Sequence, residues 1–314
     1  WGKTVRYKPV ENMMAELELL NKKYDNPPLS FVDDNMAVSR KWMDEFFTTL
    51  KESDLDLDLG ASNFDINFLD DDLIELLHSV GITNFSVALE SGSPDMQKAI
   101  RKRVKIPHAK KVLESIKKRD LYISINWIIG FPHETMEQIH QTFEVARELR
   151  AHSNQFLICL PYPKTKLYDD AKRDDMLLIS ENENHYDMYE KFDNRQADFI
   201  KSDEWNRDIL VDMIYQVNLE LNFLINPNLE TELGRGALLK KFLKLRNGLT
   251  EHIILNIMIG YLFGLENNLD KETYYFEEAH KLTKNKEIFK IFSNVMTLDY
   301  LPLIKYREYI DRTY

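Results

Sequence analysis

The chain has 314 residues, a net charge of −11 and a single cysteine, Cys159. One thiol excludes an intrachain disulfide framework, an all-cysteine zinc site and a cluster held by three thiolates of this chain. The negative net charge argues against a nucleic-acid partner. No apolar run approaches the ~18 residues that are needed to cross a bilayer. The composition therefore predicts a cytoplasmic globular protein of about two domains.

The first two-thirds of the chain alternate short apolar runs with amphipathic helical patterns. This alternation predicts a parallel sheet covered by helices, which places the chain in the α/β class. The apolar runs predict strands at 29–33, 55–60, 85–90, 122–129 and 155–160. Helical patterns lie near 10–20 and at 39–51, 69–80, 108–119 and 134–150, with Ser39 as an N-cap and Asp70-Asp71-Asp72 at a helix start.

From about Asp203 the strand pattern ends and long helical patterns follow to the C-terminus. Within them, Gly260, Phe263, Phe276 and Ala279 resemble one tetratricopeptide-like helix pair. A helical bundle in which small residues permit close packing accounts for the same pattern equally well.

Polar residues follow the predicted strands where a parallel sheet carries its chemistry, at the carboxyl ends. Asp33-Asp34-Asn35 could hold a divalent cation or a ligand ammonium, or could cap a loop. In Glu90-Ser91-Gly92 the carboxylate could accept hydrogen bonds from ligand hydroxyls, and glycine permits a close backbone approach. Ser93 and Pro94 begin a helix in either interpretation.

The segment 130–135 joins the strand at 122–129 to the next helix, and Glu134 suits the positive end of that helix. A zinc site is not predicted, because His140 lies seven residues after His133 and a helical zinc pair needs a spacing of four. The basic cluster Arg101-Lys102-Arg103 could meet a carboxylate, although a solvated helix end explains it more simply. Trp127 could pack in the core or face a substrate cavity.

Four of these segments, in this order, resemble motifs of the radical S-adenosylmethionine (SAM) superfamily, within the group that often carries a cobalamin-binding domain. The motifs are at 31–35, 88–93, 128–135 and 161–165, and the match runs from Trp1 to about Leu178. The resemblance implies a partial (β/α)₆ TIM-like barrel. It places the SAM amino group near Asp33, Asp34 and Asn35, the ribose or carboxylate near Glu90 and Ser91, and the adenine beside Ile128, Gly130 and Pro161.

The resemblance also implies a chemistry. A [4Fe–4S] cluster would cleave SAM reductively to a 5′-deoxyadenosyl radical, for methylation or oxidative cyclisation of an unknown substrate. The family's C-x-x-x-C-x-x-C loop and first strand are absent from the 314 residues, so we expect the cluster ligands, and a cobalamin-binding domain, outside them. We therefore expect the chain alone to be inactive. Asn63 also stands where relatives often carry a basic residue, and no catalytic side chain is named.

The expected organisation is a barrel at 1–178, a linker at 179–202 and a helical domain at 203–314 that could bind a protein partner. The alternative function is a non-catalytic barrel that acts as a scaffold through its helical part. An ordinary hydrolytic or isomerising barrel is a third option, against which the lack of His, Asp and Glu clusters argues.

Overall fold

The computed structural model describes residues 6–25, 27–33, 35–36, 39–55, 57–119, 121–178 and 199–314. The chain divides into two compact units. The first contains Trp1–Ala151, Gln155–Asn182 and Phe199–Glu204, and the second contains His152–Asn154, Glu183–Asp198 and Trp205–Tyr314. Asp34 and most of the predicted linker, residues 179–198, lie outside the described residues.

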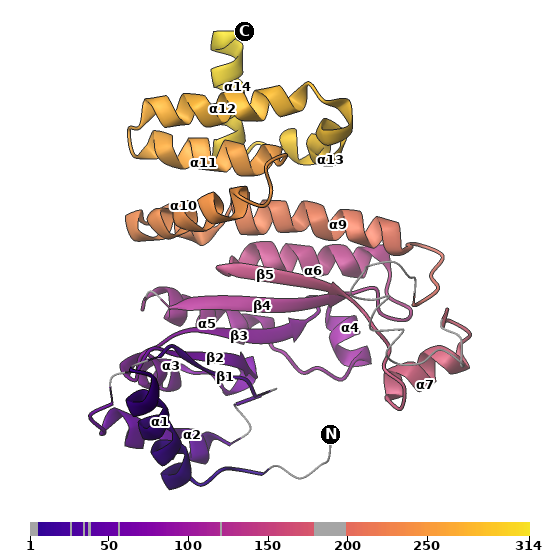
Figure 1. Cartoon of the computed structure of the whole chain (residues 1–314). Coiled ribbons are helices and arrows are strands. Elements are labelled where there is room, and N and C mark those ends of the chain that lie inside the picture. Colours follow the sequence, from indigo (N-terminus) through magenta and orange to yellow (C-terminus); the bar gives the residue numbers. More distant parts are fainter. Residues whose placement is uncertain are drawn as a thin grey trace. The chain divides into compact units, whose positions relative to one another are not determined.

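The first unit is built on a five-stranded sheet with the strand order β1-β2-β3-β4-β5. Its strands are β1 (Leu29–Phe31), β2 (Leu59–Phe64), β3 (Ile82–Glu90), β4 (Tyr122–Ile129) and β5 (Ser153–Ile158). The first four pair in parallel, and the arrow of β5 points the same way as that of β4 (Figure 1). Helices connect successive strands, so the expected α/β class and partial-barrel fold are confirmed, with five strands among the described residues.

Seven helices of the described residues accompany this sheet in the first unit. They are α1 (Val10–Tyr24), α2 (Arg40–Lys51), α3 (Asp71–Ser79), α4 (Pro94–Ala99), α5 (Ile106–Lys117), α6 (Met136–Leu149) and α7 (Lys166–Arg173). Two predicted helix starts are confirmed: the Ser39 hydroxyl accepts a hydrogen bond from the N–H of Trp42, and the Asp70 carboxylate accepts one from the N–H of Leu73.

The two faces of β4 differ, which fixes the core of the first unit. Odd-numbered side chains from Ile123 to Ile129 are fully buried, whereas the even-numbered ones are half-buried. Trp127 belongs to the buried face and stacks on Phe156, which in turn makes an edge contact with Phe143 of α6. Trp127 therefore packs in the core beneath α6, and the even-numbered face is the one left for a ligand.

Two predicted strands are displaced: the one expected at 155–160 forms two residues earlier, at Ser153–Ile158, and the one expected at 55–60 starts four residues later. The alternating segment 55–60 was expected to be a strand that ends at Gly60, but β2 starts only at Leu59 and Gly60 is its second residue. Leu57 is buried without belonging to the strand. Alternation reports which side chains are buried, and it does not by itself require ladder hydrogen bonds to a neighbouring strand.

The second unit is helical in its described part. Its helices are α9 (Arg207–Leu219), the π-helical turn η2 (Glu220–Leu224), the 3₁₀ turn η3 (Pro227–Glu230), α10 (Glu232–Arg246), α11 (Ile253–Leu265), α12 (Leu269–Thr283), α13 (Lys286–Met296) and α14 (Leu301–Thr313). Its core is centred on α11, where all residues from Ile253 to Gly260 are buried. A Cβ on Gly260 would lie 2.7 Å from the Phe276 ring, so glycine is what lets α12 pack this closely.

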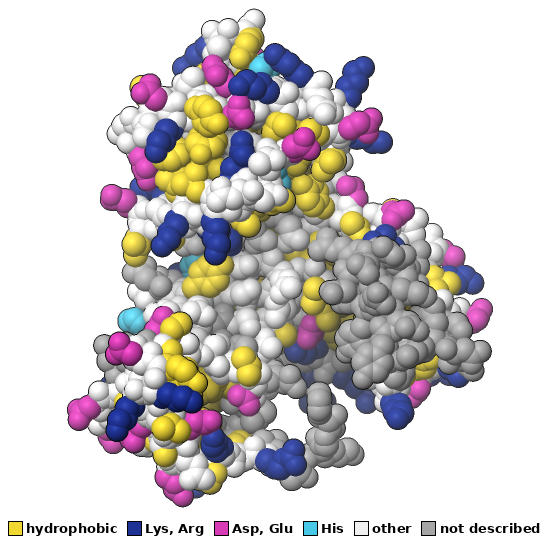
Figure 2. All heavy atoms as spheres, in the orientation of Figure 1, with side chains coloured by type: hydrophobic (Ala, Val, Ile, Leu, Met, Phe, Trp, Pro, Cys, Tyr) yellow, Lys and Arg dark blue, Asp and Glu magenta, His cyan; other side chains and the backbone are white. Residues whose placement is uncertain are grey.

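On the face drawn in Figure 2, acidic and basic side chains are interspersed over both units. No helix in the described parts of the chain combines the length and apolar character that a bilayer crossing requires.

Candidate active site at the carboxyl edge of the sheet

At the carboxyl ends of three neighbouring strands, one residue within, at or just after each strand has a positive φ angle. The φ angles are 24° at Asn63, 66° at Glu90 and 79° at Gly130. Only glycine adopts this region without cost, and other L-residues pay about 1–2 kcal/mol. Strain of this kind is usually retained at binding or catalytic sites, so the carboxyl edge formed by β2, β3 and β4 is the candidate site.

The end of β2 is held by hydrogen bonds to its neighbours. The Ser86 hydroxyl of β3 accepts a hydrogen bond from the Asn63 N–H (3.0 Å) and donates one to the Asn63 side-chain oxygen (2.8 Å). The Asn63 carbonyl accepts from the N–H of Met36, and the Asn35 side chain accepts from the N–H of Asp65. Asn63 and Asn35 therefore tie the loop after β1 to the end of β2, and the side chain of Asn63 is engaged within the protein.

Glu90 ends β3 at a bulge. Ala88 pairs with Asn126 but Glu90 pairs with Trp127, so β3 has one more residue than β4 at this point. Bulges re-aim side chains at sheet edges and next to active sites. The Glu90 carboxylate lies 3.2 Å from the ammonium of Lys102, and their side chains are 22% and 33% exposed. A half-buried carboxylate and a half-buried cation thus meet at the edge.

Ser91 and Gly92 point away from this edge, toward α6. The Ser91 hydroxyl is fully buried, lies 3.1 Å from the Thr142 hydroxyl and accepts from the N–H of Ser93. The Gly92 N–H donates to the Thr142 hydroxyl (3.0 Å), and a Cβ on Gly92 would lie 2.8 Å from the Thr142 Cα. The close approach that glycine permits here is to α6, so these two residues support the strand end from behind.

Gly130 follows β4 in a turn that is closed by Glu134. One oxygen of the Glu134 carboxylate accepts hydrogen bonds from the N–H of Gly130 (2.6 Å) and of Phe131 (3.1 Å). Glu134 is only 2% exposed. Burial raises the pKa of Glu134 from 4.5 to about 7, although the two backbone hydrogen bonds lower it. The sequence placed Glu134 at the helix end, but the N-cap of α6 is Thr135.

The end of β5 lies beside this turn. The Cys159 N–H donates to the Ile129 carbonyl (2.8 Å), and Pro161 is buried just beyond. Ile128 belongs to the half-buried face of β4, opposite Ile129. The structure therefore brings Ile128, Gly130 and Pro161 to the ends of neighbouring strands.

A row of small polar residues on the half-buried face of the sheet was not predicted from the sequence. Ser86 pairs with Ser124, and Ala88 pairs with Asn126, across β3 and β4. Ser124 and Asn126 are half-buried on the even-numbered face of β4. The available signal was the alternation Ile-Ser-Ile-Asn-Trp in an otherwise apolar strand, which indicates one polar face.

The loop after β1 contributes fewer residues to the candidate site than the ends of β2, β3 and β4. Asp33 is exposed, and Asp34 lies outside the described residues. Among the described residues, no three His, Cys, Asp or Glu side chains gather in a group that could hold a metal ion. His133 is 64% exposed at its side chain and contacts Asp174.

Residues 1–146 match the family model described as the Radical SAM superfamily. This part of the chain belongs to the radical SAM superfamily. The resemblance drawn from the four motifs is thereby confirmed for the segment that supplies β1 to β4 and most of α6.

Curated relatives match part of this chain. An uncharacterized methyltransferase of Pyrococcus horikoshii is 29% identical over 57% of this chain and 39% of its own. The anaerobic magnesium-protoporphyrin IX monomethyl ester cyclase of Rubrivivax gelatinosus is 22% identical over 67% of this chain and 36% of its own. The chain thus spans less than two-fifths of the length of these relatives. Among solved structures, the radical SAM methyltransferase TsrM of Kitasatospora setae matches 53% of this chain and 32% of its own, with 13% identity and a TM-score of 0.48.

The radical SAM family implies two groups, SAM and a [4Fe–4S] cluster. The residues of this chain fit the binding of SAM, but they do not fit the binding of the cluster. A left-handed Gly130 backbone, together with the Glu90 carboxylate and the Lys102 ammonium, offers groups that complement the ribose, ammonium and carboxylate of SAM. The cluster needs three thiolates, whereas the chain has one cysteine. Cys159 is 3% exposed, and burial, followed by the neighbouring carboxylates, raises the pKa of its thiol far above the usual range.

Proposed function

We propose that the carboxyl edge of the sheet binds SAM and positions it for radical chemistry on an unidentified substrate, either a methylation or an oxidative cyclisation. The observation that carries the proposal is the set of residues with positive φ angles at the carboxyl ends of β2, β3 and β4 in a radical SAM domain. Methyltransferase and cyclase are the activities in the names of two relatives, which supports these two outcomes.

In the proposed complex the Glu90 carboxylate accepts hydrogen bonds from the ribose hydroxyls or the ammonium of SAM. Lys102 then forms an ion pair with the SAM carboxylate, which replaces part of its ion pair with Glu90. The bulge in β3 aims Glu90 at this position, and Ser91 and Gly92 keep the bulge in register through Thr142. Asp33, Asp34 and Asn35 remain the proposed neighbours of the amino group.

The turn after β4 forms the proposed adenine side of the site. Ile128, Gly130 and Pro161 offer backbone groups and apolar surface to a planar base. Glu134 holds the peptide units of Gly130 and Phe131 in place with two hydrogen bonds.

SAM supplies a 5′-deoxyadenosyl radical when it is reductively cleaved, and the chain's part is to bind and orient both reactants. Ser124 and Asn126 provide polar groups for orienting a substrate on the same face of the sheet. The cluster of the proposal has its ligands outside the 314 residues, and cobalamin remains an expectation of the same kind. No step is assigned to Cys159.

Equilibrium dialysis of the chain against labelled SAM tests the proposal. Glu90→Gln and Lys102→Gln should each weaken binding about tenfold, which corresponds to about 1.4 kcal/mol. Glu148→Gln and Lys110→Gln are matched controls, because these residues form an exposed ion pair elsewhere in the first unit, and they should leave binding unchanged. Wild-type chain that fails to bind SAM, or controls that weaken binding as much as the site variants, would overturn the proposal and favour the scaffold alternative.

A further inference from the structure

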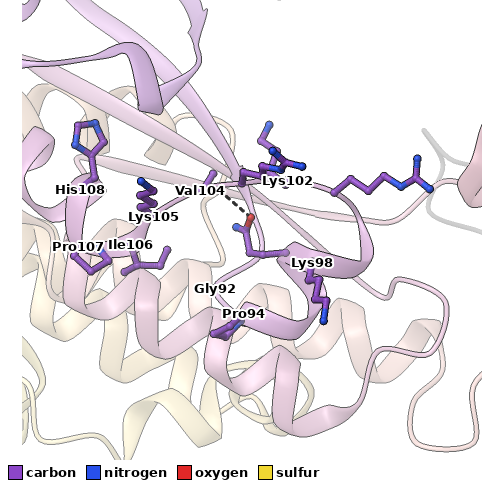
Figure 3. A pocket seen from close by; sticks show the side chains of 12 residues that line it. Gly92, Pro94, Lys98, Lys102, Val104, Lys105, Ile106, Pro107 and His108 are labelled. Atoms are coloured by element: carbon purple, nitrogen blue, oxygen red, sulfur yellow. Dashed lines mark hydrogen bonds between the residues drawn. The ribbon is translucent and has the colours of Figure 1, made fainter.

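A second feature of the first unit lies beside the candidate site, in the connection from β3 to β4. A pocket of about 720 Å³ is formed by α4, the loop after it and the first turn of α5 (Figure 3). Its lining residues are Gly92, Pro94, Gln97, Lys98, Arg101, Lys102, Arg103, Val104, Lys105, Ile106, Pro107 and His108. This volume lies within the range of pockets that hold small molecules.

The pocket is strongly basic in an acidic protein. Five of its described lining residues are lysine or arginine and none is Asp or Glu, while the whole chain has a net charge of −11. Of the five cations only Lys102 has an acidic partner among the described residues, namely Glu90. The other four lining cations have no acidic partner among the described residues, so the pocket has a positive potential that attracts anions.

The start of α5 adds positive potential to the same pocket. The N-cap of this 12-residue helix is Lys105, whose side chain caps nothing, and the first turn contains no acid. A helix N-terminus is its positive end and ordinarily attracts Asp or Glu. Helix α3 follows that rule, since Asp70 caps it and two further acids fill its first turn. The start of α5 therefore departs from the rule at the point where the pocket opens.

Exposed and half-buried side chains alternate along the loop that joins α4 to α5. Arg101, Arg103 and Lys105 are exposed, whereas Lys102 and Val104 between them are half-buried. The half-buried side is tied down, because the Val104 N–H donates to the buried Gln97 side chain, as Figure 3 shows. The exposed cations are thus presented by a fixed backbone.

We propose that this pocket binds the diphosphate group of an organic ligand, and that this ligand is the substrate of the proposed reaction. Two guanidinium forks, two or more ammonium groups and a helix N-terminus suit a group with about three negative charges better than a single carboxylate. Pro94, Ile106 and Pro107 give the rest of the pocket an apolar lining for the organic part. The assignment as substrate rests on the proposed function, whereas diphosphate binding does not.

Isothermal titration of the chain with inorganic pyrophosphate tests the site. Pyrophosphate should bind at least tenfold more tightly than orthophosphate or citrate, and its affinity should fall as salt is raised. The double variant Arg103→Gln, Lys105→Gln should weaken pyrophosphate binding at least tenfold. Lys111→Gln is the matched control, because Lys111 lies on α5 outside the pocket and is exposed, and it should change the affinity less than twofold.

The outcomes separate this proposal from the SAM proposal. The double variant should leave SAM binding within twofold of wild type, because it spares Glu90 and Lys102. Citrate that binds as tightly as pyrophosphate, an unchanged affinity in the double variant, or tighter binding to single-stranded RNA than to pyrophosphate would each overturn the diphosphate site. A wild-type chain that binds SAM but not pyrophosphate would refute this inference alone.

Discussion

Glu134 provides the sharpest test of how the turn after β4 is built. Its buried carboxylate accepts two backbone hydrogen bonds, yet burial raises its pKa from 4.5 to about 7. In the unfolded chain the group ionises near 4.5, so between the two values the folded state binds the proton more tightly. The free energy of unfolding should therefore fall as pH rises from about 4.5 to about 7, by about 3 kcal/mol from this group.

Glu134→Gln removes the titration while keeping an oxygen that can accept from the N–H groups of Gly130 and Phe131. The variant should lack the decline of about 3 kcal/mol, so its stability relative to wild type should improve as pH rises. Urea unfolding at pH 5, 6, 7 and 8, followed by tryptophan fluorescence, measures the difference at each pH. Glu148→Gln is the control, since its side chain is 55% exposed and should give a constant difference. A stability difference between wild type and the Glu134→Gln variant that stays constant within about 0.5 kcal/mol would refute the reasoning, because the folded and unfolded pKa values would then be equal.

Three further substitutions test the packing around the edge and in the second unit. Gly130→Ala should destabilise by about 1–2 kcal/mol in thermal unfolding, because φ is 79° there; an unchanged melting temperature would argue against that conformation. Thr142→Val should cost about 1–3 kcal/mol in urea unfolding, since it leaves the buried Gly92 N–H without its acceptor, and a neutral effect would show that the bond is dispensable. Gly260→Ala should destabilise by about 1–3 kcal/mol because its Cβ meets the Phe276 ring, whereas Gly236→Ala, with nothing within 4 Å, should stabilise by about 0.5–1 kcal/mol. Equal effects of the two glycine substitutions would contradict the packing of α11 on α12.

The sequence was informative where one physical signal decides the outcome. Alternation in 122–129 located β4 without error, the Ser39 cap located the start of α2, and the three acids at 70–72 indicated the start of α3. It was less informative for β2, because the Leu-Asp alternation before Gly60 describes burial and says nothing of the ladder partner. Register depends on contacts between segments far apart in the chain, which a local pattern does not contain.

The sequence predicted which edge of the sheet carries the candidate site, but it did not predict how the individual side chains are arranged there. Chain order places the ends of parallel strands together, which is why Glu90 and Gly130 share one edge. The inward position of Ser91 was not predictable, because it depends on the bulge that shifts Glu90 by one residue. The sequence suggested that the cluster 101–103 could meet a carboxylate, but it did not identify Glu90 as the partner of Lys102. That pair depends on how the intervening residues fold back through α4, which no local pattern contains.

Several unfavourable features of the first unit lie at this edge, although positive φ angles also occur at helix ends such as Asp25 and Arg150. Asn63 and Glu90 each hold a left-handed conformation that costs about 1–2 kcal/mol. Glu134 is a buried carboxylate, and Lys105 occupies the positive end of α5. The start of α3, in contrast, follows the usual preference, since Asp70 caps it. The contacts of Thr142 with Ser91 and Gly92 hold the strained end of β3 in place. We expect a protein to retain strain, a buried carboxylate and several cations in one region where a ligand of complementary charge binds them. Ligand binding should consequently stabilise the first unit more than the local geometry of any single residue would suggest, because it offsets several of these costs together.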